Sequence, residues 1–250
     1  MAVQATQSNM PVVILKDGAS QSKGLEAQKN NISAAKIIAE IVRTSLGPRG
    51  MDKMLVDSLG DVTITNDGAT ILKEIDVQHP AAKMLVEIAK TTDNEVGDGT
   101  TSAVVLAGSL LEQAESLLLQ EVHPTIIVDG YRKAAVKAKQ YLKDIAEQVT
   151  ANDKSILLKI ANTSMQTKLV KRDSSQLSDM VVRSITAVAE KQGEDYTVDI
   201  DDIKVEKKAG GSISDSSIIR GIVLDKEVVH SGMPKKITEA KIALINAALE

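Results

Sequence analysis

Apolar residues recur at three- and four-residue intervals over residues 30–150, and this spacing predicts a largely helical unit. The pattern is clearest in residues 31–47, where the apolar positions are Ile32, Ala35, Ile38, Ala39 and Val42. Gly47 and Pro48 close this stretch. Because proline cannot continue a helix and disfavours helix in the residue before it, we expect the helix to end there.

Three longer helices are predicted at residues 79–95, 100–120 and 123–149. The first and third open with His-Pro, which puts proline in the first helical turn, where its missing N–H costs nothing. The apolar stripe expected on the second helix comprises Ala103, Ala107, Leu110, Leu111, Ala114, Leu117 and Leu118. The third helix keeps Ile127, Tyr131, Ala134, Ala138, Tyr141 and Ile145 in helical register.

Shorter segments complete the pattern. Residues 52–68 favour a β-hairpin around "DSLGD", and "ATILKEI" at 69–75 favours a short helix. Further helices are expected at 155–162 and near 175–191. Strands are predicted at 11–16, 197–208, 218–229 and 240–250. This organisation places domain boundaries near residues 150 and 221.

Composition excludes several classes of function. The 250 residues include no cysteine, and the three histidines, His79, His123 and His230, are not at metal-ligand spacing. Zinc sites and Ser-His-Asp chemistry are therefore disfavoured. The net charge of −4 and the 1% aromatic content argue against nucleic-acid and anionic-membrane partners. We expect no stretch close to the roughly 20 apolar residues of a membrane span. The N-terminus shows no signal-peptide pattern, which favours a loose tail and a cytoplasmic protein.

The segment "GDGTTS", residues 97–102, stands directly before a predicted helix. Helix N-termini bind phosphate through their unpaired N–H groups, and glycine lets the backbone approach closely. A carboxylate such as Asp98 would repel a phosphate unless a cation such as Mg²⁺ lay between them. An ordinary capped helix remains an equal alternative, and the segment is not a Walker A loop.

Two further turns share this design. Leu46-Gly47-Pro48 closes one helix, and Asn66-Asp67-Gly68 joins a strand to another. Singly, each is more simply explained as a stop signal or a turn. Together the three turns favour Mg-nucleotide binding, with Asp98 on the metal and Asp67 orienting a water molecule. A small-molecule phosphotransferase is disfavoured, because no acceptor-substrate site is evident.

Five motifs stand out along the chain: "SLGPRGMDKMLVDSLGDVTITNDGATILKEIDVQHPAAKMLV", "VGDGTTSAVVLAG", "VHPTIIVDGYRKA", "KKAGGSISDS" and "GIVLDKEVVHSGMPKKI". Together they resemble the group II chaperonins, the family of the archaeal thermosome and the eukaryotic cytosolic chaperonin. The resemblance covers residues 11–250 and implies a multidomain chain. By this resemblance, the chain would consist of a mainly α equatorial ATP-binding domain with a small hairpin at 1–152, an α/β intermediate segment at 153–221, and the start of an α/β apical substrate-binding domain at 222–250.

The resemblance also implies an ATPase that folds other proteins inside a double ring of identical or homologous subunits. Asp67 would position the attacking water, and Asp98 would hold Mg²⁺. The residues expected at ATP or ADP are Ser45, Leu46, Gly47, Pro48, Gly68, Asp98, Gly99, Thr100, Thr101, Ser102, Thr167 and Lys168. Thr167 and Lys168 lie in "TSMQTK", which resembles a nucleotide-sensing loop; a solvated loop lysine is the simpler alternative. Residues 11–16 and the hairpin resemble segments that pair between subunits.

The chain departs from the family in two respects. It ends at Glu250, roughly halfway along a typical subunit, so a second water-activating aspartate and a glycine-rich nucleotide contact are not present. Ser231 stands where the family usually has proline. These departures keep open a second hypothesis, a non-catalytic structural or interaction fragment that binds nucleotide without turning it over. The 250 residues alone are expected to be inactive and to expose apolar stripes.

Overall fold

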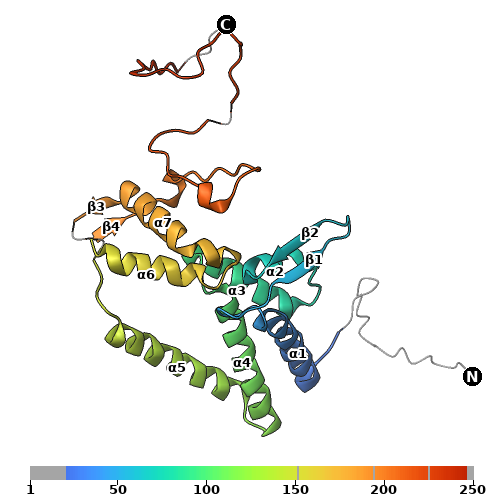
Figure 1. Cartoon of the computed structure of the whole chain (residues 1–250). Helices are drawn as coiled ribbons and strands as arrows, with labels where there is room; N and C mark the ends of the chain where they lie inside the picture. The colour runs from blue at the N-terminus through green and yellow to red at the C-terminus, as the bar shows by residue number, and fades with distance from the viewer. Residues whose placement is uncertain (1–20, 151, 194, 225, 247–250) are drawn as a thin grey trace, which may run out of the picture. The chain divides into compact units, whose positions relative to one another are not determined.

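The computed structural model describes residues 21–150, 152–193, 195–224 and 226–246, which form two compact units (Figure 1). The first unit extends to Asp179 and the second begins at Met180. The strand predicted at 11–16 and the N-terminal tail lie outside the described residues.

The first unit is built mainly from helices. They are α1 (Gly24–Arg43), α2 (Gly68–Glu74), α3 (Pro80–Val96), α4 (Thr100–Leu119), α5 (Pro124–Ile145), α6 (Lys154–Met165), the 3-10 turn η1 (Leu169–Asp173) and the start of α7 (Ser174–Val188). The predicted hairpin is confirmed: β1 (Lys53–Val56) pairs antiparallel with β2 (Val62–Thr65), with Lys53 opposite Thr65. The predicted helices are confirmed too, with two differences: α1 begins seven residues earlier than expected, and the helix expected near 175–191 ends at Val188, before a short strand.

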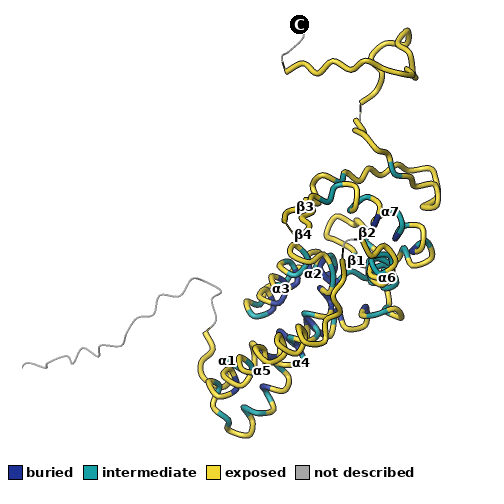
Figure 2. The backbone as a smooth tube through the Cα atoms, turned by 90° about the vertical axis from the view of Figure 1, so that its left-hand side faces the viewer, coloured by how far each residue is buried: buried dark blue, intermediate teal, exposed yellow. Residues whose placement is uncertain are grey.

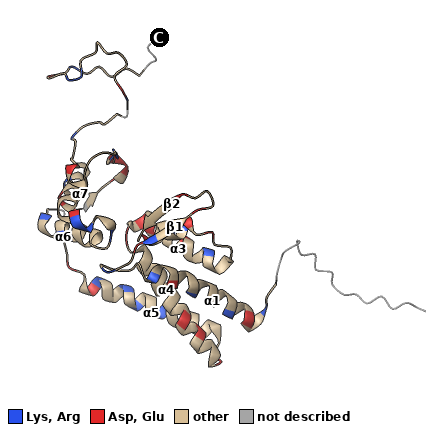
Figure 3. Ribbon diagram, turned by 45° about the vertical axis from the view of Figure 1, so that its right-hand side comes forward, with Lys and Arg blue, Asp and Glu red and all other residues tan. Residues whose placement is uncertain are grey.

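The core lies where α1, α2, α3 and α4 meet (Figure 2). All five apolar positions predicted to share one face of α1 are buried. Gly108 of α4 lets the two longest core helices approach, because a Cβ there would lie 2.2 Å from Cβ of Ala39. Lys36 adds an ion pair across the same contact, 3.0 Å from Glu115, and acidic and basic residues are mixed along α1 (Figure 3).

The buried face of α4 differs from the predicted stripe. The fully buried positions are Thr100, Thr101, Val104, Gly108 and Ala114, and of these only Ala114 belongs to the predicted stripe. Ala107 and Leu111 of that stripe are partly buried and pack against the core. The helix turns small and polar residues toward α1 and α2, whereas Leu110 stays 41% exposed. The prediction was therefore right in part: it missed the positions of closest approach, where contact between helices favours small residues.

The expectation that no segment approaches a membrane span was also wrong. Helix α4, Thr100–Leu119, has the length and mean hydropathy, 1.3, that such a span requires. A single helix of this kind is weak evidence for a membrane, since the core helix of a soluble protein meets the same criteria.

Helix α5 forms as predicted but buries little of its apolar face. Ile127 is buried, and the Tyr131 hydroxyl donates to the carbonyl oxygen of Leu110 at 2.6 Å. Further along the helix the large apolar side chains are exposed, Ile145 at 73%.

The second unit contains a small hairpin that the sequence pattern did not predict. Strand β3 (Glu190–Gln192) pairs antiparallel with β4 (Asp195–Thr197), and two 3-10 turns follow, η2 (Ile200–Asp202) and η3 (Ile213–Asp215). The strands predicted at 197–208, 218–229 and 240–250 are not found: Thr197 ends β4, and beyond it the described residues contain no strand. Residues 225 and 247–250 of these predictions lie outside the described residues. A strand needs a neighbour to satisfy its backbone groups, and residues such as Val229 are 93% exposed.

Candidate functional site

Two of the three candidate turns pack directly against each other. Gly68, the first residue of α2, is buried beside the first turn of α4. A Cβ on Gly68 would lie 2.5 Å from Thr101 Oγ1 and 3.0 Å from both Thr101 Cα and Thr101 N. The fold therefore brings "NDG" and "GDGTTS" together, although about thirty residues separate them in the chain.

Asp67 is held firmly at this junction. As the N-cap of α2 it accepts hydrogen bonds from the Thr70 backbone N–H and from Thr70 Oγ1, both at 3.0 Å. Its other carboxylate oxygen lies 2.7 Å from Lys168 Nζ. Burial raises the pKa of Asp67, but the Lys168 and Thr70 hydrogen bonds and the ammonium charge outweigh it and lower the pKa below its ordinary value. The carboxylate is thus ionised and fixed in direction.

A second contact ties the segment after α6 to the same turn. The Asn66 side-chain amide donates to the Thr167 carbonyl oxygen at 2.7 Å. The Thr167 hydroxyl donates to the carbonyl oxygen of Ser164, so that hydroxyl is engaged within its own segment. The prediction named Thr167 and Lys168 without anticipating their pairing with Asn66 and Asp67.

Asp98 sits in a different environment. Gly97 and Gly99 on either side have left-handed φ angles of 71° and 76°, which glycine adopts without strain. One oxygen of Asp98 accepts from the Gly99 N–H at 2.8 Å. Within the described part of the chain, the other oxygen has no hydrogen-bond partner. Asp98 is therefore free to take a ligand.

The first turn of α4 has no side-chain cap. Its N-cap residue is Gly99, and Thr100 and Thr101 are buried while Ser102 is exposed. This departs from the ordinary capped helix that was the alternative for this turn. Of the three hydroxyls, that of Ser102 is the accessible one, whereas Thr100 and Thr101 offer backbone N–H groups.

The residues around the Leu46-Gly47-Pro48 turn have two different roles. Ser45 is buried, and its hydroxyl donates to the Val42 carbonyl oxygen at 2.7 Å, so this side chain is engaged in ending α1. Gly47 and Pro48 instead line a cavity of about 230 Å³, which we call the turn recess, together with Asn66, Thr167 and Lys168. Four predicted residues thus share one recess: Gly47, Pro48, Thr167 and Lys168.

The turn recess also contains residues that the sequence interpretation missed. Lys171 and Arg172 line it, and Lys171 Nζ lies 3.4 Å from the Pro48 carbonyl oxygen. The signal was the basic run "KLVKR" directly after Thr167, which on its own also fits a solvated surface.

The donor set suits magnesium rather than a caged metal. No group of three or more histidine, cysteine or acidic residues at metal-binding distance occurs among the described residues. Mg²⁺ needs no such cage, because it commonly binds one or two carboxylates and completes its shell with phosphate oxygens and water. Asp98, in front of uncapped helical N–H groups, fits that pattern.

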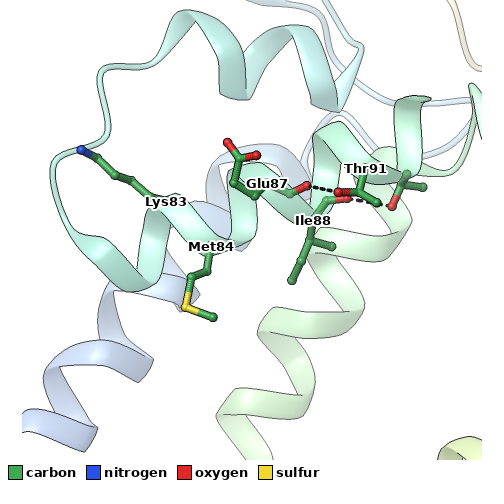
Figure 4. A pocket seen from close by; sticks show the side chains of 6 residues that line it. Lys83, Met84, Glu87, Ile88 and Thr91 are labelled. Atoms are coloured by element: carbon green, nitrogen blue, oxygen red, sulfur yellow. Dashed lines mark hydrogen bonds between the residues drawn. The ribbon is translucent and has the colours of Figure 1, made fainter. Parts of the chain in front are cut away.

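A second recess lies on the exposed side of α3 and is lined by none of the predicted site residues (Figure 4). It is lined by Lys83, Met84, Glu87, Ile88, Thr91 and Thr92. Both threonine hydroxyls donate to the helix backbone, Thr91 to the Glu87 carbonyl oxygen and Thr92 to that of Ile88. The recess therefore offers mainly an apolar surface.

Comparison with known proteins gives a consistent result. The TCP-1/cpn60 chaperonin family profile matches residues 38–250. Thermosome subunit beta of Thermococcus kodakarensis is 58% identical over 98% of this chain and 45% of its own length. Thermosome subunit alpha of Archaeoglobus fulgidus is 57% identical, and the thermosome subunit of Pyrococcus abyssi 56%, over the same shares.

Proposed function

The chain belongs to the TCP-1/cpn60 chaperonin family, and from this premise we propose that it serves an ATP-dependent chaperonin that assists the folding of other proteins. It spans about half the length of the curated relatives that it matches. The family membership favours an ATP-hydrolysing subunit over a non-catalytic interaction module.

The junction of α2 and α4 is the observation that carries the proposal. A nucleotide site requires N–H donors for phosphate, a carboxylate for the metal and a fixed polar group near the reacting phosphate. Gly68 against Thr101 joins the segments that carry these groups. In the proposed site, the N–H groups of Thr100, Thr101 and Ser102 bind phosphate oxygens, and Gly99 lets the backbone approach them closely.

Asp98 is the proposed magnesium ligand. Asp98 stands two residues before α4, and among the described residues one of its oxygens has no hydrogen-bond partner. Bound Mg²⁺ would neutralise phosphate charge, and without it Asp98 would repel the nucleotide.

Asp67 is the proposed water-positioning residue. Its lowered pKa keeps it ionised at neutral pH, so it can accept a hydrogen bond from a water molecule. Thr70 fixes one of its oxygens, and Lys168 engages the other. Lys168 would then contact both Asp67 and the terminal phosphate, and Gly47 and Pro48 would line the nucleotide.

The wider organisation is part of the same proposal. We assign residues 1–152 to an equatorial domain, 153–221 to an intermediate domain and 222–250 to the start of an apical domain. The partners would be homologous or identical subunits in a double ring, together with unfolded proteins, in the cytoplasm.

Calorimetric titration of the 250-residue chain with ATP tests the nucleotide site. Magnesium-dependent binding with one nucleotide per chain is expected, with little binding in EDTA. Asp67→Ala should retain binding, because the residue is assigned to water positioning. Absence of binding in magnesium, or equal binding in EDTA, would overturn the assignment.

A further inference from the structure

The turn recess has one strongly basic wall. Lys168, Lys171 and Arg172 line it on the side of η1, and Gly47 and Pro48 lie on the side of the turn after α1. Its volume of about 230 Å³ is several times the roughly 30 Å³ that a water molecule occupies, so a phosphate group can enter.

The positive charge in this recess is incompletely balanced. Asp52 is the acidic residue among the lining side chains. Lys168 is paired with Asp67, whereas Lys171 has, among the residues that the structure describes, a single polar contact of 3.4 Å to the neutral Pro48 carbonyl oxygen. Across the part of the chain that the structure describes, Arg172 has no side-chain hydrogen bond or ion pair. Basic groups that converge on a recess attract an oxyanion, and guanidinium suits phosphate best.

The recess is connected to the proposed phosphate site. Asn66 lines it, and the next two residues are the water-positioning Asp67 and the Gly68 that contacts Thr101. The basic wall therefore stands beside the end of the site where the phosphates would lie.

Building on the proposed function, we propose that Lys171 and Arg172 bind nucleotide phosphate oxygens and set the preference for highly charged nucleotides. The two side chains add to Lys168 rather than replace it. Their contribution grows with the number of phosphates and vanishes for a ligand that has none.

The test is a double variant, Lys171→Gln with Arg172→Gln, titrated with ATP, ADP, AMP and adenosine in magnesium. We expect about tenfold weaker ATP binding, a smaller loss for ADP and AMP, and no change for adenosine. The salt dependence of ATP binding should also fall, because two screened charges are removed. Inorganic pyrophosphate should compete with ATP less well in the variant than in the wild type.

Two controls isolate the position of the charge. Lys139→Gln with Lys143→Gln removes the same charge from the exposed face of α5 and should leave all four affinities unchanged. Lys171→Arg with Arg172→Lys retains the charge and should preserve most of the ATP affinity.

Unchanged ATP affinity in the double glutamine variant would overturn the inference while leaving the proposed function intact. An equal loss for ATP and adenosine would overturn it as well, by showing a structural role. A wild-type chain that binds no nucleotide would instead refute the proposed function on which the inference rests.

Discussion

Two aspartate–glycine turns begin helices in this molecule, and the fold treats their carboxylates oppositely. Asp67 receives two hydrogen bonds from Thr70 and an ion pair from Lys168. Asp98, between two left-handed glycines, receives one hydrogen bond, from Gly99. The same dipeptide thus yields one fixed carboxylate and one available carboxylate.

In the proposed site the two carboxylates have different tasks, and the difference in their surroundings fits those tasks. A group that orients water benefits from a fixed direction. A group that binds a metal must keep an oxygen free. The glycines differ in role too: Gly68 is required by packing, whereas Gly97 and Gly99 are required by backbone conformation.

The largest expected effect comes from filling the contact between the two turns. Gly68→Ala would place a methyl group 3.0 Å from backbone atoms of Thr101, which forces the helix ends apart. We expect the free energy of unfolding to fall by about 1–3 kcal/mol. Urea denaturation followed by circular dichroism measures this loss.

Gly130→Ala is the matched control, because that glycine lies within α5 and a Cβ there meets nothing within 4 Å. It should be neutral or stabilise by up to about 1 kcal/mol. If both variants had the same stability, the packed junction between the turns would be contradicted.

A smaller loss of stability is expected when the ion pair between Asp67 and Lys168 is removed. Lys168→Met should lower stability at pH 7 by about 1 kcal/mol, because a partly buried pair loses one partner. Since the folded-state pKa of Asp67 is lowered, its contribution is present above the ordinary value of 3.8 and is lost as pH falls through the folded pKa. The difference in the free energy of unfolding between wild type and variant should therefore become smaller on acidification from pH 7 to 3.

Unfolding curves at both pH values provide the measurement. Lys154→Met serves as the control, since it breaks the exposed pair with Asp179 and should change stability by less than about 0.5 kcal/mol. A stability gap at Lys168 that stayed constant or widened toward pH 3 would refute the link to Asp67.

The sequence predicted most helices because their periodicity is local. The spacing of residues such as Ile38 and Val42 is enough to show which face of their helix is buried. The three candidate turns could be recognised by their glycine, proline and aspartate residues. Which face of α4 is buried depends on Ala39, some seventy residues away, so its own side chains could not reveal it.

The other features that the sequence did not predict also depend on residues far apart in the chain. The Asp67–Lys168 pair joins residues 101 positions apart. The position of Lys171 in the turn recess becomes evident only from its contact with Pro48, which is distant in the sequence. Apolar runs after residue 197 have β-type composition, but composition alone supplies no neighbouring strand.

Magnesium titration of nucleotide binding by Asp98→Asn and Asp67→Asn, side by side, tests the central claim most directly. The account predicts that Asp98→Asn loses the magnesium-dependent part of the affinity, about tenfold or more, whereas Asp67→Asn stays within about twofold of wild type. Equal losses in the two variants, or a larger loss in Asp67→Asn, would contradict the division of roles between the two carboxylates.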